Sequence, residues 1–213
     1  DGWEANGVDS SSKMIEFAKE NLIEKNYDPN IVSVGFVENL SMFPDNHFDV
    51  VFSMGVIEYL TEEQELNFYK ETKRVLKKDG IFIPEYINLI FDISTFNRFT
   101  INFYKENILN RFFDDAKDIE KITLKIKELV TKPEKPDKQG KYSTTRDQVY
   151  TRGENPLTFN KTVQERGFRQ EDMVFYRFHV APPLLFEENP ELEKIAYKYE
   201  KEFCRDWLGY FTA

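Results

Sequence analysis

The sequence is poor in the residues that build disulfides, metal centres and membrane spans. It has one cysteine, Cys204, and two histidines among 213 residues. An internal disulfide is therefore impossible, and the distant histidines cannot complete a structural zinc site. Its apolar runs, such as residues 50–54 and 87–91, are far shorter than the ~20 residues of a transmembrane helix. No basic and then apolar leader opens the chain. These absences predict a soluble protein without a metal or membrane partner, in a reducing, cytoplasmic setting.

An excess of positive charge is also absent. The formal net charge is −9, and the lysines are dispersed among acidic residues. Proteins bind phosphate backbones through clustered basic surfaces, so the charge argues against a nucleic-acid partner. No Gly-x-Ser-x-Gly segment occurs, which argues against a Ser-His-Asp hydrolase. The length suits one domain, or one domain with a sizeable insertion.

Strand and helix patterns alternate over the first 86 residues, which predicts an α/β fold. We expect strands at 3–8, 31–37, 48–53 and 81–86, and helices at 11–25 and 61–78. Apolar residues run almost continuously through 48–53, which indicates a strand buried on both faces. The alternation predicts a doubly wound, Rossmann-like, mostly parallel sheet with helices on both faces.

Helix-end signals support these boundaries. The hydroxyl groups of residues 10–12 can cap the first helix, and Thr61 with Gln64 forms a capping box for the second. Lys77 and Lys78 suit the negative end of that second helix, and Gly80 can reverse the chain after it.

The pattern changes after residue 86. Residues 92–132 are rich in aromatic, aliphatic and charged residues, which predicts amphipathic helices. A charged, proline-containing link follows at 132–141. Beyond it we expect a helix at 158–166, a strand at 173–180 and a helix at 188–207. We therefore divide the chain into a partial core (1–86), a helical cap or acceptor insertion (87–152) and a segment that closes the core (153–213).

Four blocks carry a resemblance to a known family. They are Gly7-Val8-Asp9-Ser10-Ser11-Ser12-Lys13-Met14, Glu38-Asn39-Leu40, Pro44-Asp45-Asn46-His47-Phe48-Asp49-Val50-Val51 and Arg74-Val75-Leu76-Lys77-Lys78-Asp79-Gly80. In this order they resemble class I S-adenosylmethionine-dependent methyltransferases, well over 3–86 and more loosely over 159–185. The resemblance implies S-adenosylmethionine as cofactor. It also implies a first strand and a glycine-rich loop upstream, so we expect an N-terminally truncated chain that binds cofactor weakly by itself.

The resemblance places the ribose and the adenine of the cofactor at two strand ends. Asp9 stands at the family's acidic ribose ligand, with Ser10 and Met14 beside the adenosine; the simpler alternative for Asp9 is a helix cap. Phe36 replaces the acid that usually receives the adenine amino group. The backbone amide of Phe36 or Val37 can still bind the adenine edge, while the Phe36 ring either stacks on adenine or fills the core.

A third strand end is placed beside the cofactor by the same resemblance. It carries Ser53, Met54 and Gly55, and glycine there lets a ligand approach the backbone closely. The alternative is a tight turn without a ligand. Glu58 and Tyr59 stand where many small-molecule methyltransferases have a histidine pair near the acceptor, but both also suit a solvated helix start.

His179 is the stronger candidate for a general base. An oxygen or nitrogen acceptor has to lose a proton before or during attack, so a positioned base helps. His179 lies near the end of the expected late strand, where family members shape the acceptor pocket; a packing histidine is the alternative. His47 lies in a polar turn. Three weaker acceptor-pocket candidates are Glu85, Tyr86 and Asn88.

These observations favour a methyltransferase that acts on a small-molecule acceptor, with the acceptor atom left open between oxygen, nitrogen and carbon. One alternative is an NAD(P)-dependent oxidoreductase or a sugar-nucleotide enzyme, because an acid after the second strand also fits the ribose of a dinucleotide. Another is a non-catalytic, methyltransferase-like binding protein. The sequence leaves the oligomeric state open.

Overall fold

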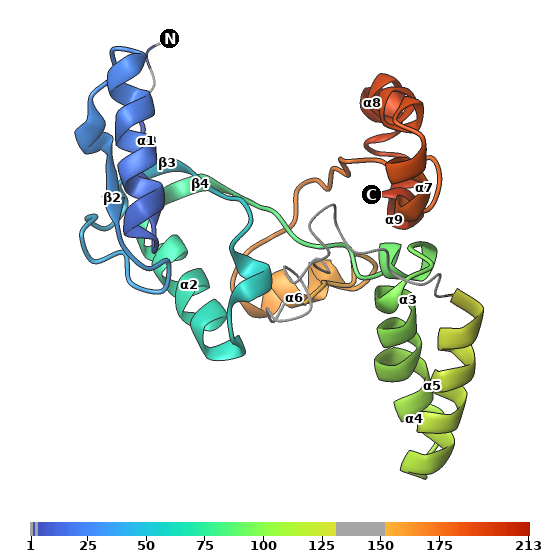
Figure 1. Cartoon of the computed structure of the whole chain (residues 1–213). Helices are drawn as coiled ribbons and strands as arrows, with labels where there is room; N and C mark the ends of the chain where they lie inside the picture. Colours follow the sequence, from blue (N-terminus) through green and yellow to red (C-terminus); the bar gives the residue numbers. More distant parts are fainter. Residues whose placement is uncertain (1, 3, 131–151) are drawn as a thin grey trace. The chain divides into compact units, whose positions relative to one another are not determined.

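The chain forms two compact units, Asp1–Glu85 and Tyr86–Ala213. The computed structural model describes residues 2, 4–130 and 152–213 (Figure 1). The link expected at 132–141 lies outside the described residues. The segment 153–213, which we expected to close the N-terminal core, groups with the second unit instead.

The first unit has the α/β organisation that the sequence predicts. Its elements are β1 (Gly7–Asp9), α1 (Ser12–Glu24), a 3-10 turn (Pro29–Ile31), β2 (Val32–Val34), β3 (Phe48–Ser53), a 3-10 turn (Ile57–Tyr59), α2 (Glu62–Val75) and β4 (Leu76–Pro84). β1 pairs with β2, and β3 with β4, both in parallel. The two ladders are separate.

Capping side chains begin both helices where the sequence predicts. The Ser11 hydroxyl accepts a hydrogen bond from the Met14 amide over 3.3 Å at the start of α1. At α2 the Gln64 amide donates to the Thr61 hydroxyl over 3.3 Å, and the Thr61 amide donates to Oε1 of Gln64 over 3.0 Å. The reciprocal capping box is therefore confirmed.

The end of α2 differs from the sequence-based expectation. The helix ends at Val75, and β4 begins at the next residue, so Lys77 and Lys78 lie in a strand. Asp79, with φ of 65°, adopts the left-handed conformation that we expected of Gly80. Gly80 is required for another reason: a Cβ atom there would lie 3.0 Å from the Lys77 carbonyl oxygen. The register shift between Phe48 and Val50 accommodates this crowded start of β4.

One face of the β3–β4 ladder is covered by α2. Phe68 and Tyr69 of the helix pack edge-on against Phe82, with ring centroids 5.6 and 5.8 Å apart, and both are buried. On the other face, Val50 opposite Ile81 and Phe52 opposite Ile83 are all exposed within the described structure. The expectation that β3 is buried on both faces is therefore wrong for the part of the chain that is described.

The second unit is helical in its described part. It contains a 3-10 turn (Phe91–Ser94), α3 (Arg98–Phe103), a π-helical stretch (Tyr104–Leu109), α4 (Asn110–Phe112), α5 (Ala116–Val130), α6 (Phe159–Glu165), α7 (Pro183–Glu188), α8 (Glu191–Phe203) and α9 (Gly209–Thr212). The strand expected at 173–180 is not formed. Its amides bond to helical segments instead, Phe175 to the Cys204 carbonyl over 2.7 Å and His179 to the Thr212 carbonyl over 2.6 Å. Phe175 and Phe178 bury against Ala196 of α8.

Candidate functional site

Asp9 ends β1 with one carboxylate oxygen engaged and one open. Oδ1 accepts a hydrogen bond from the Ser11 amide over 2.7 Å, which fixes the turn into α1. The Asp9 carbonyl accepts from the Gly35 amide over 3.0 Å, which ties the end of β1 to the end of β2. Oδ2 has no partner among the described residues, and the side chain is exposed. Asp9 thus stabilises the turn through Oδ1 and keeps Oδ2 as a hydrogen-bond acceptor for a ligand. Ser10, the next residue, and Met14, in the first turn of α1, are also exposed.

The Phe36 side chain is 57% exposed, so it does not fill the core. Its carbonyl accepts a hydrogen bond from the Asn39 amide over 3.0 Å, which closes a tight turn. Val37, the next residue, is half-buried. Of the two interpretations of the Phe36 ring, core packing is wrong, and stacking on a flat ligand remains a prediction.

The end of β3 presents a buried hydroxyl and an open glycine. Ser53 is buried, and its hydroxyl has no hydrogen-bond partner in the described structure. Gly55 has φ of 62°, and no atom lies within 4 Å of the position that a Cβ would take. Met54, between them, is half exposed. This strand end therefore leaves free space for a ligand at Gly55, whereas the Ser53 hydroxyl lies out of contact with solvent.

Glu85 holds that strand end in place, a role that sequence reasoning missed. Its carboxylate Oε2 accepts a hydrogen bond from the Gly55 amide over 2.8 Å. Its own amide donates to the Ser53 carbonyl, also over 2.8 Å. The position of Glu85 directly after β4 is the sequence feature that could have indicated this role. The sequence analysis places Glu85 in an acceptor pocket.

Glu58 and Tyr59 lie together in the 3-10 turn Ile57–Tyr59 and differ in exposure. Glu58 is 8% exposed, whereas Tyr59 is 50% exposed. A solvated helix start therefore describes Tyr59 but not Glu58. Burial of a carboxyl group requires compensating interactions, so Glu58 is fixed in the fold rather than free to move.

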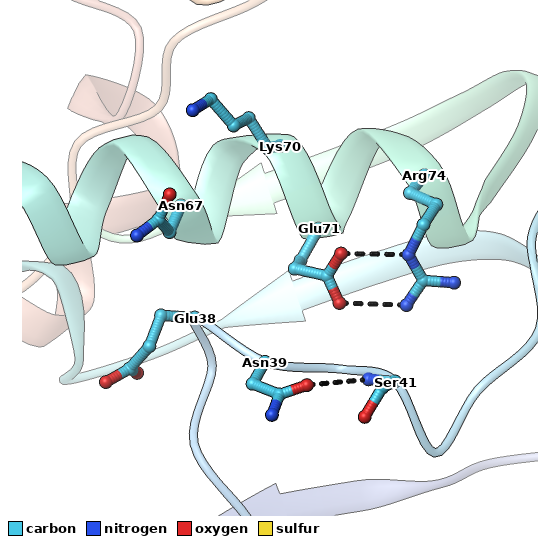
Figure 2. A pocket seen from close by; sticks show the side chains of 7 residues that line it. All are labelled: Glu38, Asn39, Ser41, Asn67, Lys70, Glu71 and Arg74. Carbon is cyan, nitrogen blue, oxygen red and sulfur yellow. Dashed lines mark hydrogen bonds and ion pairs between the residues drawn. The ribbon is translucent and has the colours of Figure 1, made fainter.

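A polar cavity of about 400 Å³ lies between α2 and the segment that follows β2 (Figure 2). Its lining residues are Glu38, Asn39, Ser41, Asn67, Lys70, Glu71 and Arg74. The Arg74 guanidinium makes a two-point ion pair with Glu71, at 2.8 Å for both contacts. It also binds Asp45 at 2.7 Å and the carbonyl oxygens of Leu40 and Phe43 at 2.9 Å.

This cluster fastens the segment after β2 to α2. The Leu40 amide donates to Oε2 of Glu71 over 2.8 Å, and Gln64 donates to Glu38 over 3.2 Å. The Arg74 hydrogen bonds, with help from the Leu40 amide, lower the pKa of Glu71. The Nε, Nη1 and Nη2 atoms of Arg74 all donate hydrogen bonds to groups of the protein. We therefore interpret the cavity as a structural junction rather than a ligand site. Sequence analysis identified Arg74 only as part of a family block.

His179 lies in the second unit between two aromatic rings. The ring centroids of Phe91 and Phe186 are each 4.9 Å from that of His179. Its Nδ1 atom is buried without a hydrogen-bond partner in the described structure. Burial lowers the pKa of His179, and the carbonyl groups of Thr212 and Arg177 partly offset that effect.

Two weaker acceptor-pocket candidates, Tyr86 and Asn88, make contacts within the second unit. Tyr86 packs against Phe159, with ring centroids 4.5 Å apart. The Asn88 side-chain amide donates to the carbonyls of Gly209 and Tyr210 over 3.2 and 3.1 Å. His47 is exposed and packs edge-on against Phe48.

The described residues contain no group of three or more His, Cys, Asp or Glu side chains able to hold a metal ion. None of the helices within them has the length and apolar character needed to cross a membrane.

Comparison with known proteins identifies the first unit. A family model described as a methyltransferase domain matches residues 1–83. The PH0226 protein of Pyrococcus horikoshii is 35% identical over 41% of this chain and 41% of its own, with a TM-score of 0.38. A SAM-dependent methyltransferase from Archaeoglobus fulgidus is 18% identical over 96% of this chain and 71% of its own, with a TM-score of 0.46.

A further similar structure is a putative S-adenosyl-L-methionine-dependent methyltransferase from Methanococcus maripaludis, 19% identical over 57% of this chain and 56% of its own, with a TM-score of 0.32. The chain thus spans about two-fifths of the PH0226 protein's length. No curated protein matches the chain. The cofactor of the matched family is S-adenosylmethionine. By that match and its four sequence blocks, the segment of residues 1–83 belongs to the class I S-adenosylmethionine-dependent methyltransferase family.

Proposed function

We propose that the protein transfers a methyl group from S-adenosylmethionine to a small-molecule acceptor. The observation that carries the proposal is Asp9, which ends β1 with Oδ1 held by Ser11 and Oδ2 open, within the segment that matches a methyltransferase domain. A carboxylate in this position accepts hydrogen bonds from ribose hydroxyls. The residues present therefore fit the nucleoside part of the cofactor.

Two other strand ends support the same fit. Phe36 at the end of β2 presents an exposed ring, which suits stacking on adenine. At the end of β3, Gly55 leaves open space for the ligand, and we assign Ser53, two residues before it, to the same site. We assign binding roles in the same site to Ser10, Val37 and Met54, which are sequence neighbours of these residues, and to Met14, which lies in the first turn of α1 after Asp9.

Bound S-adenosylmethionine supplies a methyl group on a sulfonium, which leaves as a neutral thioether. Because the leaving group needs no proton, the protein's main task is to align the acceptor with the methyl carbon. An oxygen or nitrogen acceptor also gives up a proton, and we propose three residues for that step. His179, in the second unit, is one candidate and would accept the proton as an uncharged imidazole. Glu58 and Tyr59, in the first unit, are separate candidates that would bind or deprotonate the acceptor.

Turnover of the cofactor tests this function. The protein, with any residues that its gene encodes upstream of Asp1, is mixed with S-adenosylmethionine and a panel of uncharged alcohols, phenols and amines. We expect S-adenosylhomocysteine to form with one class of acceptor and not without acceptor. Turnover that Asp9→Asn leaves unchanged would remove Asp9 from the site. Reduction or oxidation of NAD in place of methyl transfer would favour an oxidoreductase.

A further inference from the structure

The residue after the end of the β1–β2 ladder places an aromatic ring near Asp9. In that ladder Asp9 pairs with Val34, and the Gly35 amide continues the pairing by donating to the Asp9 carbonyl over 3.0 Å. Phe36 is the next residue, and neighbouring strands lie about 4.8 Å apart. Paired residues, and residues two apart along a strand, point to the same side of a sheet. Asp9, Val34 and Phe36 therefore share one side of the ladder.

That side is open to solvent at all three positions. Asp9 is exposed, and the side chains of Val34 and Phe36 are 48% and 57% exposed. A nucleoside needs this combination of groups. Its ribose hydroxyls donate hydrogen bonds to a carboxylate, and its base has flat faces that stack on an aromatic ring.

The backbone on either side of Phe36 is fixed. A Cβ atom at Gly35 would lie 2.8 Å from side-chain atoms of both Val8 and Met42, so the chain packs tightly just before the ring. Just after it, the Phe36 carbonyl accepts a hydrogen bond from the Asn39 amide over 3.0 Å. A ring on a fixed backbone loses little freedom when a ligand stacks on it, which favours affinity.

Both carboxylates at these two strand ends have other partners. Residues 7–14 and 34–41 contain two acidic residues, Asp9 and Glu38. Asp9 binds the turn into α1 and is assigned to the ribose. Glu38 lines the polar cavity against α2, where its Oε1 accepts a hydrogen bond from Gln64 over 3.2 Å (Figure 2). The exposed side chain left for the base is therefore a hydrocarbon ring.

An aromatic ring and a carboxylate recognise a purine in different ways. Stacking tolerates changes of base, because every base has a π-face. A carboxylate that accepts from the 6-amino group discriminates, because a base without that group leaves the carboxylate unpaired. At the position where the resemblance implies such an acid, this chain has Phe36.

We propose that the cofactor site binds the purine by its face, on Phe36, and does not recognise the 6-amino group. A cofactor whose base carries hydrogen in place of that group therefore binds as well as the adenine form. This inference rests on the function proposed above, since it takes the ligand of Asp9 to be the ribose of S-adenosylmethionine. Phe36 determines specificity for the base and does not contact the transferred methyl group.

Calorimetry with a matched pair of ligands tests the inference. The protein, with any residues that its gene encodes upstream of Asp1, is titrated with S-adenosylhomocysteine and with its purine-riboside analogue, in which hydrogen replaces the 6-amino group. We expect the two dissociation constants to agree within about threefold. A larger loss of affinity for the analogue would overturn the inference and leave the methyltransferase function in place. Binding of neither ligand would contradict the function itself and this inference with it.

Two variants of Phe36 test whether the base lies on its ring. Phe36→Leu keeps an apolar side chain and removes the π-face, so both ligands should bind roughly 5- to 100-fold more weakly with their ratio unchanged. Phe36→Asp supplies an acceptor for the 6-amino group. Loss of stacking weakens both ligands alike, so the ratio is the readout, and S-adenosylhomocysteine should then be preferred by about fivefold or more.

Tyr27→Leu is the matched control. Tyr27 is 64% exposed and lies between α1 and the start of β2, at the opposite end of that strand from Phe36. Its replacement should alter neither affinity. Native affinities in Phe36→Leu, or no preference for S-adenosylhomocysteine in Phe36→Asp with native circular dichroism, would show that the base does not lie on Phe36 and would overturn the proposal.

Discussion

The Gly55 amide donates a hydrogen bond to Oε2 of Glu85 over 2.8 Å, which joins the residues that follow β3 and β4. Gly55 has a positive φ and open space beside its Cα. The carboxylate therefore fixes the backbone at the place where we propose that the cofactor lies. Glu85 is a positioning residue in this account and does not contact the reacting atoms.

Two substitutions of Glu85 distinguish the effect of its hydrogen bond to Gly55 from the effect of its charge. Glu85→Ala removes the acceptor for the Gly55 amide, so we expect unfolding free energy to fall by about 1–3 kcal/mol and S-adenosylhomocysteine affinity to fall with it. Glu85→Gln keeps an acceptor oxygen and should retain most of both. Asp49→Ala, at an exposed ion pair with Lys77 on the same ladder, serves as the control. Equal affinity in Glu85→Ala and the native protein, by calorimetry, would contradict the role.

Asp9 has two separable tasks, since Oδ1 holds the Ser11 amide and Oδ2 is open. Asp9→Asn keeps an acceptor for the turn but loses the charge, so stability should hold while cofactor affinity falls roughly 10- to 100-fold. Asp9→Ala should lose the affinity and also about 1 kcal/mol of stability. Urea unfolding and calorimetry measure the two effects.

Asp28 offers a matched control for Asp9. Its Oδ1 accepts from the Asn30 amide over 2.9 Å in a similar turn ahead of a 3-10 helix. Asp28→Ala should therefore lower stability by a similar amount and leave cofactor affinity unchanged. If Asp9→Ala and Asp28→Ala have the same cofactor affinity, Asp9 only caps the helix and does not bind the cofactor.

The ion pair of Glu71 and Arg74 should make stability depend on acid pH. The Arg74 hydrogen bonds hold the pKa of Glu71 below its usual value, so the folded state releases this proton more readily than the unfolded state. Its stabilisation is complete above the unfolded pKa of about 4.3 and is lost as the pH falls through the lower, folded pKa. Glu71→Gln should cost about 1–3 kcal/mol at pH 7. A difference from native protein that fails to shrink in acid would contradict this linkage.

His179 should act in a different pH window. Burial lowers its pKa, so the uncharged ring persists below the usual value of about 6.5. We expect the methyl-transfer rate to be flat near neutral pH and to fall only under more acidic conditions. His179→Asn should lower kcat about 100-fold or more if the ring is the base, with a smaller change in KM. An unchanged pH profile in that variant would leave His179 a packing residue.

Local chemistry made parts of the first unit predictable. The Ser11 cap, the Thr61–Gln64 capping box and the bounds of β3 follow from a few neighbouring residues. These interactions are short-range, so the structure of the rest of the chain changes them little. The parallel strand pairs likewise follow from the alternation of strand and helix patterns.

Long-range contacts decided what the sequence could not show. α2 ends early because residues after Val75 pair with β3, which overrides the helix-end signals of the lysines that follow. Residues 173–180 alternate like a strand, yet their amides bond to the ends of helices. The roles of Glu85 and Arg74 depend on partners about 30 residues away, and no local pattern marks those partners.

Calorimetric titration of S-adenosylhomocysteine tests the central claim most directly, with NAD as the control ligand. It is performed on the protein with any residues that its gene encodes upstream of Asp1. We predict saturable binding of S-adenosylhomocysteine that Asp9→Asn weakens, and no binding of NAD. Binding of NAD alone would contradict the account, and binding of neither ligand would favour a non-catalytic protein that retains the fold.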